Sequence, residues 1–348
     1  MTDEQSLFVV GSYTDEGGDG LTSYSVDSNS VERRDVADEP NPSFLDIHPS
    51  ESICIAVNER EGGSAVSYRV DPTTGQFEYL DGTATGDNGP CHIAIGPRGE
   101  YAVVSHYTGG SVALLSVGTD GSLRGPIDRR VHEGSGPSEE RQSSAHPHSA
   151  WFVADSTVYV PDLGADRLIV YELDRIDERL RPVPEATIDC PPGTGPRHVA
   201  MHPDVSVGYL VNELDATLSV VDFDTVRQPR IWDTHSTLPN GVDAADTTAA
   251  GVHVDPSSEY VFVSNRGHDS IATFERQESP RHVTLKAVTP TTGQWPRGFA
   301  IHPDGDRLFV CHQHSDDLVT FAFDAGTGEL RREGPRIRMN APTCLQFL

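Results

Sequence analysis

WPRGFAIHPDGDRLFVCHQ (residues 295–313) contains two short apolar runs on either side of a polar turn. The first run opens with a proline and closes in an HPDG turn, and the second is the run LFVCHQ. Short apolar and β-branched runs that are bounded by proline, glycine and aspartate are typical of β-strands. This stretch therefore predicts two strands joined by a turn.

The second run has counterparts along the whole chain. Seven runs share its character, namely FVVGSY, CIAVNE, AVVSHY, VYVPDL, YLVNEL, VFVSNR and LFVCHQ. Their last valines, which lie 47 to 56 residues apart, are Val10, Val57, Val104, Val160, Val211, Val263 and Val310. Four-stranded propeller blades in known repeat families are about 40 to 50 residues long. The spacing therefore predicts one blade for each run.

The first run recurs as well, 13 to 15 residues before six of these valines. Its copies are NPSFLDIHPS, GPCHIAIGPRG, HPHSAWFVADS, GPRHVAMHPD, AAGVHVDPSS and WPRGFAIHPDG. The copy missing before Val10 occurs at the other end of the chain, as APTCLQFL (341–348). A closed ring explains this arrangement, because the last strand then completes the blade that the first strand begins. We therefore predict an all-β fold, a seven-bladed β-propeller of four-stranded blades that forms a single domain over residues 1–348.

The charge of the chain limits its partners. The formal net charge is −27, which repels nucleic acid and anionic membranes, so we expect neither as a partner. Of the 26 basic residues one is a lysine, Lys286. Excess acid with almost no lysine indicates a surface suited to high salt, where screening weakens self-repulsion, so we expect a halophilic source. The remaining partner class is a small molecule, and we expect a monomer or small homo-oligomer.

Targeting and redox signals are weak. The N-terminus, MTDEQSLFVVGSYT, has no basic region, and no stretch approaches 18 apolar residues, so we expect a cytoplasmic protein without a membrane span. The five cysteines are scattered and form no CxxC pair. They predict neither a disulfide framework nor a zinc ribbon, and we expect them to pack in the core.

The blade repeat predicts where a site lies. The first strand of each blade surrounds the central channel, so residues at the ends of these strands meet at a channel mouth, where ligands bind. Directly after the opening proline come Ser43, Cys91, His148, Arg197, Arg297 and Thr343. Two and three residues after the marker valines come Glu59 and Arg60, His106 and Tyr107, Glu213 and Leu214, Asn265 and Arg266, and His312 and Gln313. The densest set of ionisable side chains is His148, Arg197, Glu213 and Arg266.

The sequence also resembles a known family, the seven-bladed propeller lactonases that include bacterial 6-phosphogluconolactonase and fungal carboxymuconate cyclase. The resemblance rests on VGSYT (10–14), NPSFL (41–45), HYTGGSV (106–112), RQxxxHxHS (141–149), PDLGADR (161–167), GTGPRHVAMHP (193–203), VNEL (211–214) and SNRGHDSI (264–271). It implies that the active-site residues are His148, Arg197, Glu213 and Arg266, the four that the blade pattern selects. The chain departs from the family pattern in having HPHS for HAHS, His106 for an asparagine, and Gly251 for a glutamate.

The chemistry of these residue types suits lactone hydrolysis. Histidine has an ordinary pKa near 6.5, so His148 is our candidate for the base that activates water. Arg197 and Arg266 are candidates for anchoring an anionic group and for stabilising the oxyanion, and Glu213 for orienting His148 or an arginine. Each has a structural alternative: a hydrogen-bonded histidine at a strand end, and salt bridges within an acidic protein. Arg297 occupies the same blade position as Arg197, so we expect it to be a second anion contact.

Four further residues are candidates for binding substrate, namely His146, His106, Tyr107 and His92. We expect no cofactor, but a metal stays open, because residues two apart on an extended strand point to one face. His146 and His148 could then chelate a metal together, with Glu213 or His106 as a third ligand. In the alternative, His148 faces the channel while His146, Arg141 and Gln142 brace the loop.

The sequence analysis thus predicts an enzyme that hydrolyses a sugar-acid lactone, with 6-phosphogluconolactone as the expected substrate. Two alternatives stay open at this point. A cycloisomerase acting on a carboxymuconate-type acid would use the same arginines for carboxylates, and a non-catalytic propeller would serve as a binding platform. Whether the lactone is phosphorylated is a further open point, because arginines also bind sugar hydroxyls and acidic lactones.

Overall fold

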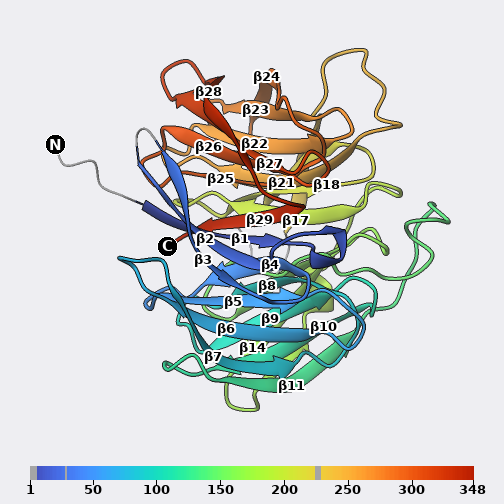
Figure 1. The fold of residues 1–348 in the computed structure, drawn as a ribbon. Coiled ribbons are helices and arrows are strands. Elements are labelled where there is room, and N and C mark those ends of the chain that lie inside the picture. Colours follow the sequence, from blue (N-terminus) through green and yellow to red (C-terminus); the bar gives the residue numbers. More distant parts are fainter. Residues whose placement is uncertain (1–5, 28–29, 224–228) are drawn as a thin grey trace.

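The structure is a computed structural model that describes residues 6–27, 30–223 and 229–348, and it confirms the predicted architecture. Seven antiparallel sheets form the blades of a ring in the described part of the chain (Figure 1). The two short helical segments are 3₁₀ turns, η1 (Thr14–Glu16) and η2 (Pro184–Ala186). Among the described residues, no helix has the length and apolar character that crossing a membrane requires.

The blades are numbered here in the order of their second strands along the chain, and their strands are given from the innermost outward. Blade 1 consists of β29 (Pro342–Phe347), β1 (Ser6–Ser12), β2 (Leu21–Val26) and β3 (Val31–Ala37). Blade 2 consists of β4 (Pro42–Ile47), β5 (Ile53–Asn58), β6 (Ser64–Val70) and β7 (Phe77–Ala84). Blade 3 consists of β8 (Pro90–Ile95), β9 (Tyr101–His106), β10 (Ser111–Val117) and β11 (Leu123–Val131).

Blade 4 consists of β12 (Trp151–Phe152), β13 (Thr157–Asp162), β14 (Arg167–Asp174) and an outer strand in two pieces, β15 (Arg179–Pro182) and β16 (Ile188–Asp189). Blade 5 consists of β17 (Pro196–Met201), β18 (Val207–Asn212), β19 (Thr217–Asp222) and β20 (Arg230–Ser236). Blade 6 consists of β21 (Thr248–Val254), β22 (Tyr260–Arg266), β23 (Ser270–Arg276) and β24 (Val283–Pro290). Blade 7 consists of β25 (Pro296–Ile301), β26 (Arg307–His312), β27 (Asp317–Asp324) and β28 (Glu329–Arg338).

The ring closes as the sequence predicts. β29 pairs antiparallel with β1, with Val10 opposite Leu345 and Phe8 opposite Phe347. Figure 1 shows β29, in red, lying beside β1, in dark blue. The pairing leaves neither strand with an open edge at the point of closure.

The apolar core lies between the blades. The described residues form seven buried clusters, and each cluster combines side chains of two neighbouring blades. In β13, Val158 and Val160 pack against blade 3 while Tyr159 packs against blade 5. Both faces of such a strand are buried, which explains why the second strands read as continuous apolar runs rather than as alternating ones.

The start of each innermost strand has a recurring backbone geometry. The residue before the opening proline has a positive φ in five blades, at Asn41, Gly89, Gly195, Trp295 and Ala341. Directly after the proline, the register against the second strand shifts, as it does between Pro196 and His198. Such a bulge leaves one residue unpaired and re-aims its side chain. It therefore turns the residue after the proline toward the channel.

Blade 4 departs from this pattern, and one sequence expectation needs correction there. HPHSAWFVADS is not a full strand, because regular pairing covers Trp151 and Phe152 alone. Before them, Pro147 makes an isolated bridge to Asp162, and the His148 amide donates to the Pro161 carbonyl (2.9 Å). The irregular backbone gives His148 a position that a regular strand would not.

Candidate active site

The central channel contains a cavity of about 590 Å³, counting its open ends. The innermost strands of all seven blades line it, so it lies on the axis of the ring. Five of the residues that follow an opening proline are in its wall, namely Ser43, Cys91, Arg197, Arg297 and Thr343. The repeat thus located the channel wall correctly. All five cysteines are buried, as expected, and two of them, Cys91 and Cys344, also line the cavity.

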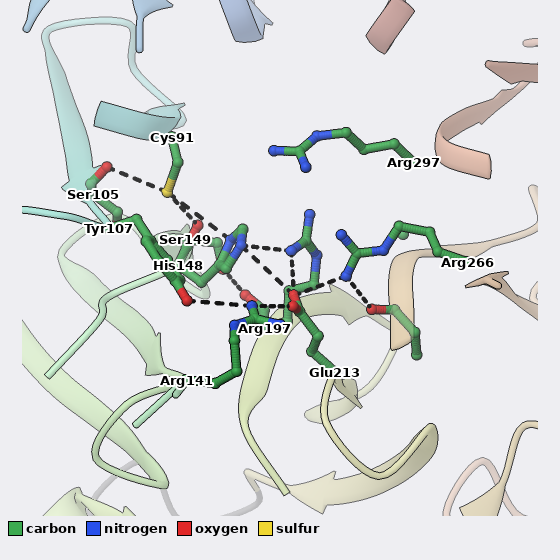
Figure 2. Close-up of polar contacts among 12 residues, drawn as sticks. Cys91, Ser105, Tyr107, Arg141, His148, Ser149, Arg197, Glu213, Arg266 and Arg297 are labelled. Atoms are coloured by element: carbon green, nitrogen blue, oxygen red, sulfur yellow. Dashed lines mark hydrogen bonds and ion pairs between the residues drawn. The ribbon is translucent and has the colours of Figure 1, made fainter. Parts of the chain in front are cut away.

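Glu213 is the centre of a charged cluster that reaches the cavity wall through Arg197, whereas Glu213, His148 and Arg266 themselves are not wall residues. It follows β18, and its backbone is held by hydrogen bonds to Gly195 and Ala249 of the neighbouring innermost strands. Its carboxylate contacts Arg197 through Oε2, Arg266 through the same oxygen (3.0 Å) and Arg141 through Oε1 (2.5 Å). Figure 2 shows the guanidinium groups gathered around this one carboxylate.

The contacts decide the charge of Glu213. Its side chain is 1% exposed, and burial alone raises the pKa of a carboxyl group. The charges of Arg266 and Arg197 outweigh burial and hold the pKa of Glu213 well below its ordinary value. Burial lowers the pKa of Arg266 to about 9 against the attraction of Glu213, so this guanidinium is still charged at neutral pH.

His148 lies beside Arg197. Nη1 of Arg197 donates to Nε2 of His148 (2.5 Å), and Oε2 of Glu213 is 3.8 Å from the same nitrogen. Burial and the charge of Arg197 lower the pKa of His148 well below its ordinary value, so the imidazole is neutral. A neutral ring that accepts at Nε2 carries its proton on Nδ1. Nδ1 is 4.0 Å from Sγ of Cys91.

Arg297 is held by Tyr13 and Glu59, which follow strands of blades 1 and 2. Its Nη2 donates to the hydroxyl of Tyr13 (2.7 Å) and lies 4.0 Å from Oε2 of Glu59, and the Tyr13 hydroxyl donates to the same carboxylate oxygen (2.8 Å). Burial lowers the pKa of Arg297, but the surrounding Tyr13 and Glu59 leave that pKa above its ordinary value. Tyr13 was not foreseen from the sequence, although it belongs to the VGSYT motif.

The cluster is positive in an otherwise acidic protein. Arg141, Arg197, Arg266 and Arg297 carry four positive charges, while Glu59 and Glu213 carry two negative charges. The six groups therefore have an excess of two positive charges, whereas the whole chain has a net charge of −27. Such a mouth attracts an anion.

Two predicted residues form the rim next to His148. The ring of Tyr107 stacks on His146, with ring centres 4.5 Å apart, and makes a T-shaped contact with the ring of His148. Nδ1 of His146 bonds to the backbone oxygen of Tyr107 (2.7 Å). Arg141 completes the rim, because it donates to the Tyr107 hydroxyl (3.2 Å) as well as to Glu213. Sequence reasoning assigned Arg141 to loop bracing alone and missed its contact with the cluster.

The structure does not bring His106 and His92 to the same place. His106 is fully buried inside blade 3, where Nδ1 contacts the Ser111 carbonyl (3.3 Å), and burial lowers its pKa to about 4. His92 lies behind the channel wall, stacked on Phe44 with ring centres 4.0 Å apart. Burial lowers the pKa of His92 to about 3. Neither side chain contacts the charged cluster.

The described residues contain no group of three or more His, Cys, Asp or Glu side chains that could hold a metal ion. The condition for chelation by His146 and His148 was an extended strand, and the backbone there is irregular. Nδ1 of His146 is engaged by Tyr107 and Nε2 of His148 by Arg197. Gln142 braces the loop as expected, through a hydrogen bond to the Leu163 carbonyl (2.8 Å).

Comparisons with known proteins extend these observations. Residues 7–347 match the model of a family described as lactonase, 7-bladed beta-propeller. The chain is 30% identical over 346 residues to the 6-phosphogluconolactonase of Bacillus subtilis, with 97% of each chain covered. It is 28% identical to the 6-phosphogluconolactonase of Formosa agariphila, over 97% of this chain and 98% of the relative. The solved structure of the periplasmic gluconolactonase of Pseudomonas aeruginosa matches with a TM-score of 0.92 and 29% identity, over 99% of each chain.

Proposed function

The chain belongs to the seven-bladed β-propeller lactonase family, and from this membership we propose that it hydrolyses the ring ester of a sugar-acid lactone, 6-phosphogluconolactone in particular. The observation that carries the proposal is the set of contacts at the channel mouth. A neutral histidine and two buried arginines, Arg197 and Arg266, lie within hydrogen-bonding reach of one another or of the Glu213 carboxylate. These are the groups that ester hydrolysis of an anionic substrate needs.

Arg197 and Arg266 hold the lactone carbonyl oxygen in this mechanism. Both guanidinium groups are 4% exposed, and each also has an Nε that finds no hydrogen-bond partner in the described part of the chain. In a site that excludes water, donors that are already in place stabilise the negative charge that develops on the carbonyl oxygen during attack.

His148 acts as the base. In the substrate-free arrangement Nε2 accepts a hydrogen bond from Arg197, so it is not free for water. When the carbonyl oxygen of the lactone takes the hydrogen bond from Arg197, Nε2 accepts a proton from the attacking water. The imidazolium formed lies 3.8 Å from Glu213, which favours its charge. The same proton is then given to the ring oxygen as the C–O bond breaks, so the base is regenerated.

Arg297 anchors the charged end of the substrate. It lines the cavity, where Tyr13 and Glu59 hold it, and it is 17% exposed. The excess of two positive charges at the mouth matches a phosphate dianion better than a neutral sugar. The names of the Bacillus and Formosa relatives point the same way. His146, Tyr107 and Arg141 form the rim next to His148, where they contact sugar hydroxyl groups near the reacting carbonyl.

The test is proton release in a weakly buffered solution that contains KCl. The purified protein is given freshly made 6-phosphogluconolactone or gluconolactone, and the rate is compared with spontaneous hydrolysis, with and without chelator. His148→Ala should abolish the acceleration, while His235→Ala, on the outer strand of blade 5, should keep it. Acceleration of neither lactone would overturn the proposal and lead to a test of muconate-type acids, and loss of activity with chelator would show that a metal takes part.

A further inference from the structure

Trp295 has a backbone conformation that its side chain disfavours. Its φ is +64°, in the left-handed region, which is a genuine outlier for a bulky aromatic residue. The equivalent residue before the opening proline is glycine in blades 3 and 5, at Gly89 and Gly195. Glycine adopts this conformation at no steric cost, whereas other residues are strained. A tryptophan at this position needs a reason in what its side chain does.

The backbone of Trp295 is tied to the turn that follows Arg266. Oδ1 of Asp269 accepts hydrogen bonds from the amide of Trp295 (2.8 Å) and from the amide of Gly267 (3.2 Å). Gly267 directly follows Arg266 in the sequence. One carboxylate oxygen therefore couples the strained residue of blade 7 to the end of β22 in blade 6.

The indole ring of Trp295 meets the guanidinium of Arg266. The guanidinium carbon lies over the ring, 5.4 Å from its centre, and the indole stacks on His314, with ring centres 4.7 Å apart and planes 14° apart. A cation over the face of an indole is attracted to the ring, and the attraction is strongest where water is excluded. Arg266 is 4% exposed, so this condition is met.

The polar contacts of Arg266 leave its orientation incompletely determined. Nη2 makes both the contact with Glu213 (3.0 Å) and the hydrogen bond to the Ala249 carbonyl (3.2 Å). A planar group bonded through one nitrogen can still rotate about that point, so packing against its face is needed to hold the plane. Figure 2 shows these two contacts converging on the same nitrogen.

We propose that Trp295 is a positioning residue for Arg266: its strained backbone holds the indole where the ring orients the guanidinium toward the reacting carbonyl oxygen. This inference rests on the proposed lactonase function, in which Arg266 touches that oxygen. Trp295 itself contacts no reacting atom. It acts through Arg266, and the strain is the cost of placing an aromatic ring at a position suited to glycine.

The test compares Trp295→Leu with Trp295→Phe. Both side chains are apolar and strained at a positive φ, so they differ chiefly in the aromatic ring. We expect Leu to lower kcat by roughly tenfold with KM changed less than threefold, and Phe to restore most of kcat, because the ring-to-cation attraction is what is lost. Trp295→Gly should lose activity as Leu does, although its backbone is relaxed. Trp232→Leu is the matched control, because that indole also lies near an arginine, Arg230 (4.9 Å), but on the outer strand of blade 5.

A second readout separates this inference from the proposed function. Inorganic phosphate is a tetrahedral anion, as is the oxyanion intermediate, and calorimetry measures its affinity without any turnover. Trp295→Leu should weaken phosphate binding by roughly fivefold or more relative to Trp295→Phe. If the wild type hydrolyses no lactone but this difference holds, the proposed function fails and the positioning role stands. Equal kcat for Leu and Phe in an active enzyme would overturn the positioning role, as would equal phosphate affinities or a wild type that does not bind phosphate.

Discussion

Nη1 of Arg197 lies 2.5 Å from Nε2 of His148, so the guanidinium occupies the nitrogen that a base would use. The pair keeps the imidazole neutral and its lone pair covered until a competing acceptor reaches Arg197. In the proposed mechanism the lactone carbonyl is such an acceptor, so substrate binding and activation of the base would become one event.

Replacement of His148 should remove the chemical step and leave binding. In the proposed mechanism His148→Asn loses the base, so kcat should fall roughly 100-fold or more while KM changes little. Initial rates of proton release give both constants. A variant with unchanged kcat would show that the base is elsewhere.

Glu213→Gln should destabilise the protein. The substitution leaves Arg197, Arg266 and Arg141 around a neutral amide, and breaking a buried ion pair in this way costs about 3–5 kcal/mol. Denaturant unfolding in constant KCl measures the loss, and added phosphate should recover more stability in the variant than in the wild type, because the anion replaces the missing charge. Glu78→Gln is the control, since Glu78 pairs with Arg69 on the surface and is 66% exposed. Equal losses for the two variants would contradict the buried cluster as the source of the effect.

Arg297→Gln should change substrate preference. If Arg297 anchors a phosphate, the variant loses roughly tenfold or more in kcat/KM for 6-phosphogluconolactone and less for gluconolactone, because a charge-assisted contact to the phosphate is removed. Parallel assays with the two lactones give the ratio. Arg69→Gln, at a surface ion pair, should leave the ratio unchanged. A ratio that stays constant in Arg297→Gln would place the anion contact on other arginines.

Stability should fall with pH below about 6.5 because several histidines are buried neutral. Burial holds the pKa of His92 at about 3 and that of His253 at about 4, so unfolding takes up protons between these values and the unfolded pKa near 6.5. The contribution is fully present above pH 6.5 and is lost as the pH falls. His92→Phe keeps the stacking on Phe44 and removes one group that takes up a proton on unfolding. The free energy of unfolding of this variant should therefore change less steeply with pH than that of the wild type, by about 1.4 kcal/mol per pH unit. Denaturant unfolding between pH 4.5 and 7.5 checks this, and parallel curves for the variant and the wild type would contradict it.

Melting temperature should rise with KCl. With a net charge of −27 the folded chain repels itself, and salt at about 1 M shortens the screening length to about 3 Å. Thermal unfolding from low to molar KCl measures the effect, and a flat response would speak against the halophilic source, which stays a prediction. The cytoplasmic location stays a prediction as well.

How far the sequence predicts this site depends on how regular the backbone is. Arg197 and Arg297 were found because the bulge after the opening proline repeats from blade to blade. Their position in the repeat therefore indicates that their side chains point toward the channel. His106 was misplaced because it ends β9, where the side chain turns into its own blade toward Ser111. Position along a repeat does not by itself give the direction of a side chain at a strand end.

Arg141 was underestimated for a different reason. The segment 132–145, which precedes the blade 4 copy of the repeat, has no counterpart in the other blades, so no repeat position gives its geometry. Tyr13 and Glu59 lie in turns of different blades, and their contact with Arg297 depends on ring closure. Contacts of this kind join residues 46 to 284 positions apart and leave no local pattern in the sequence.

The closure of blade 1 also has a consequence during synthesis. Of the strands described, β1 is made first and β29 last, so the three outer strands of blade 1 wait for the innermost one while the other six blades are synthesised. At about 5–20 residues per second this delay is roughly 15 to 70 s. Thr343 of β29 is part of the cavity wall, so a nascent chain has an incomplete pocket. Until β29 has emerged, the nascent chain is thus a propeller with a gap, and the proposed reaction has to wait for the strand that seals the circle.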